Sequence, residues 1–315
     1  MSWLLDGDPA IRWQALRDLT DASPSDVEAE RARVATTGWG RRLLDLQAGG
    51  RWADGACFPG RDWRAPEGVV GDPDGQPWTA TLPTLRLLRD LGIDPTDPAV
   101  QTAVEDVRAH ARWEYDDLPF FDGEVEPCIN GGTVALGAYF GQNVDRVVER
   151  LLGEQLEDGG WNCEAENGSV RSSFHSTICV LEGLLDYERA GGGLPVAEAR
   201  RRGEEYLLTR RLLRRESTGE VVDPAWLQLS FPVQWHYDVL RGLDYFRSVG
   251  SEPDPRLSEA IDHLRSRQQP DGRWLLENTH PGLAWFRMED GDGAPSRWNS
   301  LRALRVLRWY DAHRG

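Results

Sequence analysis

The sequence predicts an all-helical fold in which about six inner and five outer helices close into one α/α toroid, with residues 1–315 forming a single domain. Three observations lead to this prediction. Apolar residues recur with a helical period, one turn motif occurs three times, and six similar segments follow turns. Helix pairs that stack on their neighbours bury a continuous core, so a ring of such pairs is the expected architecture.

Helical periodicity is the primary signal. Leu257, Ala260, Ile261 and Leu264 follow the i, i+3, i+4, i+7 pattern of one helix face, and sustained strand alternation is absent from the sequence. Helix starts are marked by a residue able to cap free amides beside a proline. These starts are Asp8-Pro9, Asp97-Pro98, Asp254-Pro255 and Pro295-Ser296.

The turn motif consists of Gln, two or three residues, Gly, one residue and Trp. It occurs at 47–52, 155–161 and 268–274, with its tryptophans almost evenly spaced. The six inner helices are expected to begin near residues 9, 77, 127, 174, 235 and 296. The five outer helices are expected at 25–47, 97–113, 144–156, 195–215 and 254–268. Two connections rich in Gly, Pro and Asp, 53–76 and 276–294, are long enough to cover the mouth of a central cavity, and irregular decoration is the other interpretation of them.

Composition excludes several classes of function. The formal charge of −16 disfavours a nucleic-acid partner, because binding to phosphates depends on clustered cations. All 36 basic residues are arginine, which leaves no lysine for Schiff-base chemistry. Neither a long apolar run nor a signal peptide is found, so the expected location is cytoplasmic and not within a membrane. The oligomeric state is left open.

Polar residues at the starts of the inner helices are expected to surround one mouth of the ring. Cysteine and histidine are preferred Zn²⁺ ligands, with a carboxylate as a common partner. The candidate metal ligands are Cys128, Cys163, His175, His236 and Glu126. Buried cysteines and hydrogen-bonded histidines of an ordinary core are the competing interpretation.

Other residues at the same mouth are candidates for chemistry and for substrate contacts. Asp238 suits a general base, and Arg297 suits an anionic group such as a diphosphate or carboxylate. With Tyr237 they form the candidate catalytic set, although Arg297 equally suits a salt bridge. An apolar pocket is expected to be lined by Trp78, Asn130, Trp235, Trp298 and Asn299, and the tryptophans among them equally suit plain core.

An acidic loop offers a different chemistry. Asp122, Glu124 and Glu126 place three carboxylates beside Cys128. Two carboxylates that face each other across a cavity act as a glycosidase acid and base, and carboxylates also bind Ca²⁺ or Mg²⁺. A solvated turn is the simplest interpretation of the same loop.

The turn motif is similar to the QW repeat of squalene and oxidosqualene cyclases, whose Gln and Trp tie an outer helix to the following turn. This resemblance implies a terpenoid cyclase-like toroid. The sequence lacks the acidic Asp-x-Asp-Asp motif with which those cyclases protonate a polyene. Glu126-Pro127-Cys128 followed one unit later by His175 resembles the zinc site of protein prenyltransferase β-subunits, which implies Glu126, Cys128 and His175 as ligands.

Together these features predict a zinc-dependent enzyme that acts on an apolar small molecule, such as an isoprenoid, in the central cavity. Two other functions stay open. One is a non-catalytic toroid with a structural metal that binds a ligand or partner, and the other is a carbohydrate-active α/α-barrel enzyme.

Overall fold

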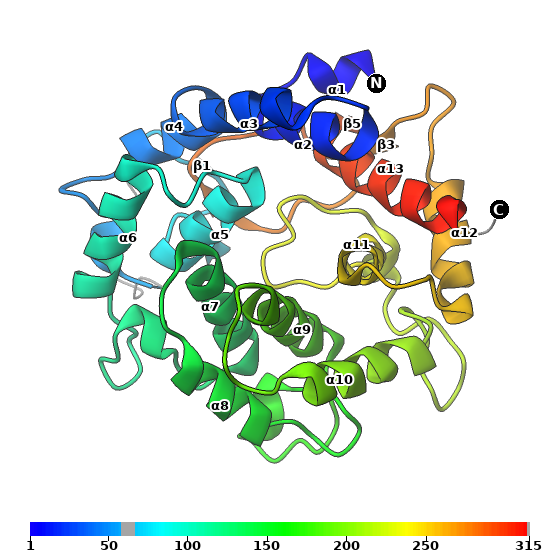
Figure 1. Ribbon diagram of the computed structural model, residues 1–315. Coiled ribbons are helices and arrows are strands. Elements are labelled where there is room, and N and C mark those ends of the chain that lie inside the picture. The colour runs from blue at the N-terminus through cyan, green and yellow to red at the C-terminus, as the bar shows by residue number, and fades with distance from the viewer. Residues whose placement is uncertain (58–66, 314–315) are drawn as a thin grey trace.

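The computed structural model describes residues 1–57 and 67–313, and shows a ring of helices two layers deep (Figure 1). The inner layer consists of α2 (Pro9–Leu19), α5 (Thr81–Leu91), α7 (Pro127–Phe140), α9 (Phe174–Arg189), α11 (Val239–Val249) and α13 (Arg297–Ala312). The outer layer consists of α3 (Pro24–Ala32), α4 (Gly38–Asp45), α6 (Pro98–His110), α8 (Asp145–Gly153), α10 (Ala197–Thr209) and α12 (Ser258–Ser266), with the short α1 (Ser2–Leu5) beside α2. The predicted all-α toroid with six inner helices is therefore confirmed.

The ring closes where α13 packs against α2, the last inner helix against the first. A buried hydrogen bond reinforces this closure, because Arg305 Nη1 donates to Gln14 Oε1 at 2.9 Å. The predicted caps form as expected. Asp8, Asp97 and Asp254 each accept a backbone N–H two residues ahead, and Ser296 Oγ accepts the N–H of Asn299 at 2.9 Å.

The first outer element departs from the prediction. A single helix over 25–47 is wrong, because α3 ends at Ala32 and a 3₁₀ turn, η1 (Arg33–Ala35), leads into α4. Gly38 has φ +72°, and a Cβ there would lie 2.2 Å from Asp8 Oδ2. The same carboxylate accepts the N–H of Trp39 at 2.9 Å, so the break fixes α4 against the start of α2.

The three turn motifs make the same hydrogen bond in the structure. The indole N–H of Trp52 donates to Leu43 O, that of Trp161 to Leu151 O and that of Trp274 to Leu264 O, at 2.7 to 2.9 Å. Each turn thus grips the end of its outer helix. A hydroxyl from the next inner helix then bonds the backbone of each tryptophan, from Thr81, Thr177 and Ser300 respectively. At most 1% of the surface of each of these tryptophans is exposed.

The closest helix contact is between α7 and α9, and glycine makes it possible. A Cβ at Gly131 would lie 2.4 Å from the carbonyl oxygen of Cys179, and a Cβ at Gly183 would lie 2.3 Å from Gly131 O. Because backbone atoms occupy those positions, larger residues have no room to adjust.

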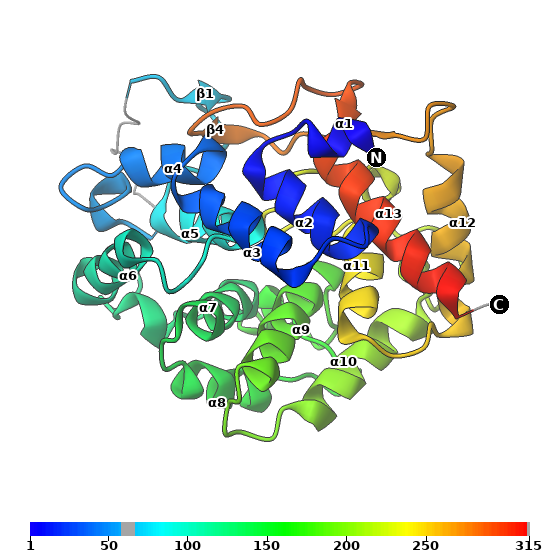
Figure 2. The same cartoon turned by 45° about the horizontal axis from the view of Figure 1, so that its top comes forward.

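Two short sheets and one crossing segment shape the ends of the ring. Strands β1 (Val70–Gly71), β4 (Gly282–Ala284) and β2 (Gln76–Pro77) form a three-stranded sheet, and β3 (Trp274–Leu275) pairs with β5 (Pro295–Ser296). The three-stranded sheet lies over one rim of the ring, beside α4 and α5 (Figure 2). The segment 228–238 runs through the middle of the ring and is held there by Asn299, which donates to Leu229 O at 3.1 Å.

The remaining connections include five further 3₁₀ turns: η2 (Ala53–Gly55), η3 (Phe120–Asp122), η4 (Cys163–Ala165), η5 (Pro224–Leu227) and η6 (Pro255–Leu257). Within the described residues, none of the helices combines the length and the apolar character that a membrane crossing requires.

Candidate functional site

A roofed chamber of about 360 Å³ lies at the mouth where the inner helices begin. Parts of both long loops form its roof, a role that the sequence left open: Val70 and Gly71 from the first loop, and residues of 276–292 from the second. Residues 58–66 of the first loop lie outside the described residues. Four large aromatic side chains line the walls. They are Trp78, Phe231, Trp285 and Phe286.

Hydrogen bonds fix two of the indoles of this roofed chamber. Trp285 Nε1 donates to Thr84 Oγ1 at 2.9 Å, and Trp78 Nε1 donates to Pro281 O at 3.1 Å. Because their only polar atoms are satisfied by the walls, these rings present apolar faces to the chamber. Trp78 was predicted to line a substrate pocket, and the structure places it in the wall of the roofed chamber.

The carboxyl group of Glu289 lies in the chamber wall, and its surroundings alter its pKa. Its Oε1 accepts hydrogen bonds from Ser296 Oγ at 2.8 Å and from Trp298 N at 3.1 Å. Burial raises the pKa of Glu289 above its usual value, and these hydrogen bonds oppose only part of that shift. Glu289 was not among the predicted site residues, since Asp and Glu in the loop 276–294 resemble ordinary loop residues.

Three histidines, the histidine cluster, lie beside the roofed chamber: His175, His236 and His280. The rings of His236 and His280 stack 3.6 Å apart and nearly parallel. Burial lowers the pKa of His236 to about 3 and those of His175 and His280 to about 4, so all three are neutral at pH 7. Neither His236 Nδ1 nor His280 Nε2 has a hydrogen-bond partner among the described residues.

The predicted metal ligands divide into two groups. Glu126, Cys128 and Cys163 offer ligand atoms that all lie within 4.8 Å of one another. The two sulfur atoms are 3.1 Å apart, and Cys128 Sγ donates to Glu126 Oε2 at 3.5 Å. His175 and His236 do not join them. His175 Nδ1 instead accepts the backbone N–H of Tyr237 at 2.8 Å.

The predicted catalytic residues do not line the roofed chamber, and their side chains instead contact the backbone or a neighbouring ring. Asp238 is buried and caps α11, accepting Arg241 N at 2.7 Å and Ser230 N at 3.1 Å. Tyr237 is buried and donates its hydroxyl to Leu212 O at 2.6 Å. Arg297 lies over the ring of Trp3, 4.6 Å from its centroid. None of the three predicted residues is positioned as a general base or anion clamp, because each is already engaged in holding a turn or a helix end.

Four other predicted pocket residues lie outside the roofed chamber. Asn130 exchanges two hydrogen bonds of 2.8 Å with the backbone of Glu124, and Asn299 bonds the crossing segment. Trp235 stacks on His236 at 3.8 Å. Trp298 stacks on Phe231 at 4.4 Å and lines a different cavity.

The acidic loop does not provide facing carboxylates. Asp122 lies 3.7 Å from Arg146, Glu124 folds back on the backbone N–H of Val125, and Glu126 is beside Cys128. None of the three acidic residues lines the roofed chamber or the central cavity. The requirement of the carbohydrate-active interpretation is therefore not met.

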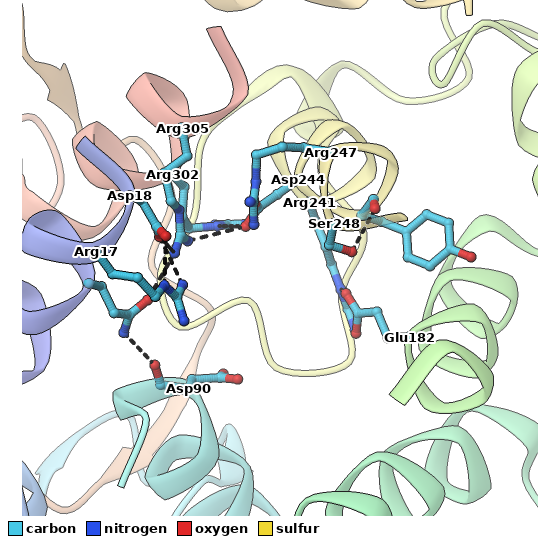
Figure 3. A network of polar contacts seen from close by, with 12 residues as sticks. Arg17, Asp18, Asp90, Glu182, Arg241, Asp244, Arg247, Ser248, Arg302 and Arg305 are labelled. Carbon is cyan, nitrogen blue, oxygen red and sulfur yellow. Dashed lines mark hydrogen bonds and ion pairs between the residues drawn. The ribbon is translucent and has the colours of Figure 1, made fainter. Parts of the chain in front are cut away.

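The central cavity, about 400 Å³, lies inside the ring on the other side of the crossing segment, and residues of all six inner helices line it. Phe231 and Gln234 line both this cavity and the roofed chamber. Its walls are rich in arginine, as Figure 3 shows for part of them. The arginines are Arg17, Arg31, Arg86, Arg89, Arg189, Arg241, Arg247, Arg302 and Arg305.

This cavity was not predicted from the sequence, although the sequence contains a signal for it. Arginine recurs between leucines on the predicted inner helices, as in Leu85-Arg86 and Leu301-Arg302. A charged residue repeated at one register of buried helices indicates a polar interior, since lone buried charges are costly.

Fold and site together define an α/α toroid with an aromatic chamber under its roof and an arginine-lined cavity at its centre. Over 97% of its length the chain is similar to the type II terpene cyclase MstE from Scytonema, at 16% identity, 87% coverage of that chain and a TM-score of 0.47. A protein from Actinoplanes has 18% identity, with 97% of this chain and 90% of that one covered and a TM-score of 0.44. A variant of MstE in complex with geranylgeranyl dihydroxybenzoate has 17% identity, covering 97% and 87% of the two chains, with a TM-score of 0.41. No family model and no curated protein matches the chain.

Proposed function

We propose that the protein is an enzyme that binds an apolar small molecule of the isoprenoid class in the roofed chamber and transfers a proton to it. One observation carries this proposal: a carboxyl group with a raised pKa, Glu289, lies in the wall of an aromatic chamber. A volume of about 360 Å³ falls within the range of small-molecule sites.

The chemistry follows from the wall. A protonated carboxyl donates its proton to one carbon of a C=C bond and leaves a cation on the other carbon. The faces of Trp78 and Trp285 stabilise such a cation through their quadrupoles. His280 lines the same chamber as a neutral imidazole, which suits it to accept a proton from the cation at the end of the reaction.

Binding and proton transfer are tested separately. Farnesol or geranylgeraniol is titrated against the full chain by tryptophan fluorescence, and Trp285→Ala is expected to weaken binding. Incubation in D₂O followed by mass spectrometry then measures deuterium in the recovered lipid. Glu289→Gln is expected to retain binding and lose deuterium incorporation, whereas Asp292→Asn, at an exposed carboxyl of the same chamber, retains both. Incorporation that survives in Glu289→Gln refutes the assignment of the acid.

We also propose that Glu126, Cys128 and Cys163 bind Zn²⁺. Two thiolates and a carboxylate are a suitable donor set, and three protein ligands leave a fourth position for water. Two sulfurs bound to one zinc at tetrahedral geometry lie about 3.8 Å apart, so the pair needs only a small separation from its present 3.1 Å. When bound in such an open site, zinc lowers the pKa of water or polarises an oxygen.

Metal analysis of protein purified without a histidine tag tests the zinc site. About one equivalent of zinc is expected. Cys128→Ser is expected to lose it, and Cys57→Ser, at a buried thiol elsewhere, is expected to keep it. Less than about a tenth of an equivalent in the unaltered protein contradicts the proposal.

A further inference from the structure

The central cavity differs in charge from the rest of this acidic protein. Among the described residues, nine arginines line it but only four acidic residues do, although the chain has 36 arginines and 52 acidic residues. We propose that this cavity binds a compact polyanion, the chemistry shared by phosphates and polycarboxylates. The inference is independent of the function proposed for the roofed chamber.

Asp244 shows how the positive charge is left unbalanced. Arg247 Nε donates to Asp244 Oδ1 at 2.7 Å, while Arg302 and Arg305 each approach Oδ2 to 3.5 Å (Figure 3). Burial by itself would raise the pKa of Asp244, but the three guanidinium groups lower it well below its usual range. One carboxylate therefore serves three arginines.

A second carboxylate does not restore the balance. Asp18 lies 3.1 Å from Arg305 Nη1, but its oxygens already accept two hydrogen bonds from Arg17, at 2.6 and 2.8 Å. The four arginines of this wall thus share two carboxylates, which leaves a surplus of two positive charges. Asp18 and the four acidic residues of the lining together leave the nine arginines of the cavity with a surplus of four.

Free donors accompany this surplus. Arg86 forms no hydrogen bond or ion pair with another described residue, although its guanidinium lies against Gly132, where a Cβ would be 2.2 Å from Nη2. Arg305 is 8% exposed, and its Nε has no partner within the described part of the chain. The buried indole N–H of Trp298 likewise has no hydrogen-bond partner among the described residues. Arg86 is half-buried, but Arg305 Nε and Trp298 Nε1 are buried donors, which carry a desolvation penalty until an acceptor arrives.

An oxyanion meets all of these requirements. The planar fork of arginine matches the paired oxygens of phosphate and carboxylate groups, and such charge-assisted bonds are the strong ones. A ligand with two or more negative charges offsets the surplus, and a cavity of about 400 Å³ has room for a small metabolite. The net charge of −16 opposes anions at long range, so the attraction must come from this local cluster.

Calorimetric titration of the full chain tests the proposal, with inorganic diphosphate and citrate as separate ligands at pH 7 and low ionic strength. We expect one site with a Kd below about 1 mM for at least one of them, weakening as NaCl is added. Preference for diphosphate indicates a phosphate ligand, and preference for citrate indicates a polycarboxylate. Absence of binding for both overturns the proposal.

Two variants locate the site. Arg86→Gln and Arg302→Gln are each expected to weaken binding about tenfold, the loss of one charge-assisted contact. Arg201→Gln is the control, since this exposed arginine pairs with Glu198 on the outer face of α10. Arg86→Gln breaks no hydrogen bond or ion pair with the described residues, so we expect the fold to be retained. Affinity unchanged in both cavity variants means an adventitious ion only, and refutes the site. Trp285→Ala leaves this affinity unaltered, which separates the test from that of the roofed chamber.

Discussion

Replacing Asp244 by Asn isolates the electrostatic argument for the central cavity. The substitution keeps the shape of the side chain and removes the negative charge that Arg247, Arg302 and Arg305 share. Removing one partner of a buried ion pair costs about 3 to 5 kcal/mol, because the other charges stay buried. At roughly 2 °C per kcal/mol for a large chain, Tm should fall by about 6 to 10 °C.

The stabilisation that Asp244 provides should also depend on pH, in a direction that follows from its lowered pKa. The pKa of Asp244 is lowered in the folded state, so its stabilisation is present above the unfolded pKa of about 4 and is lost as pH falls through the folded pKa. The gap in stability between the two proteins should therefore be full at pH 7 and shrink below about pH 4. Asp45→Asn removes an exposed pair with Arg41 that solvent screens, and should leave Tm nearly unchanged.

Thermal unfolding followed by circular dichroism measures both effects, with and without diphosphate. Saturating anion stabilises whichever protein binds it, by about 2.7 kcal/mol at one hundred times Kd. The Asp244→Asn protein should gain at least as much as the unaltered one, because it has one more uncompensated positive charge. A Tm for Asp244→Asn within about 1 °C of the unaltered protein would show that the arginines are satisfied by solvent, and would refute the reasoning.

Three further predictions concern the fold around the cavities. Gly183→Ala should destabilise the chain by about 1 to 3 kcal/mol in urea unfolding, because its Cβ meets backbone, whereas Gly153→Ala, with open space around it, should be neutral or stabilising. Trp161→Phe removes the 2.7 Å indole bond to Leu151 O, which keeps only the longer bond from Glu154 N at 3.3 Å; a loss of stability below about 0.5 kcal/mol would contradict the role of the turn motif. The histidine cluster is neutral when folded, so stability should fall as pH drops from about 6.5 towards 4, by at most about 1.4 kcal/mol per pH unit for each histidine; His236→Asn should flatten this slope.

Helix starts and the repeated turns could be predicted from residues that are close together in the sequence. The caps at Asp8, Asp97 and Asp254 depend on residues adjacent in the chain, so capping preferences alone predicted them. The turn motif worked for a similar reason, since each tryptophan reaches the helix just before it. The break at Gly38 was missed because its cause, the carboxylate of Asp8, comes from another helix.

The candidate site was predicted less completely. The sequence indicated that polar residues gather at one mouth of the ring and left open whether the two long loops cover it; in the structure Trp78 and parts of both loops line the roofed chamber. It grouped Cys128 and Cys163 with His175 by their equivalent positions in the ring, but the side chain of His175 turns to the backbone of Tyr237. Ring position sets where a Cα lies, and neighbouring side chains decide where the imidazole points.

What the sequence determined by itself is the ring: helical period, caps and repeated turns are interactions within one unit or between consecutive units, and they can be read along the chain. Only the tertiary structure decided what the ring encloses. The segment 228–238 divides the interior, with Glu289 on one side and the arginines on the other, and these residues come from units far apart in sequence. Their charge and their pKa values depend on burial and on neighbours that exist only once the first and last helices have met.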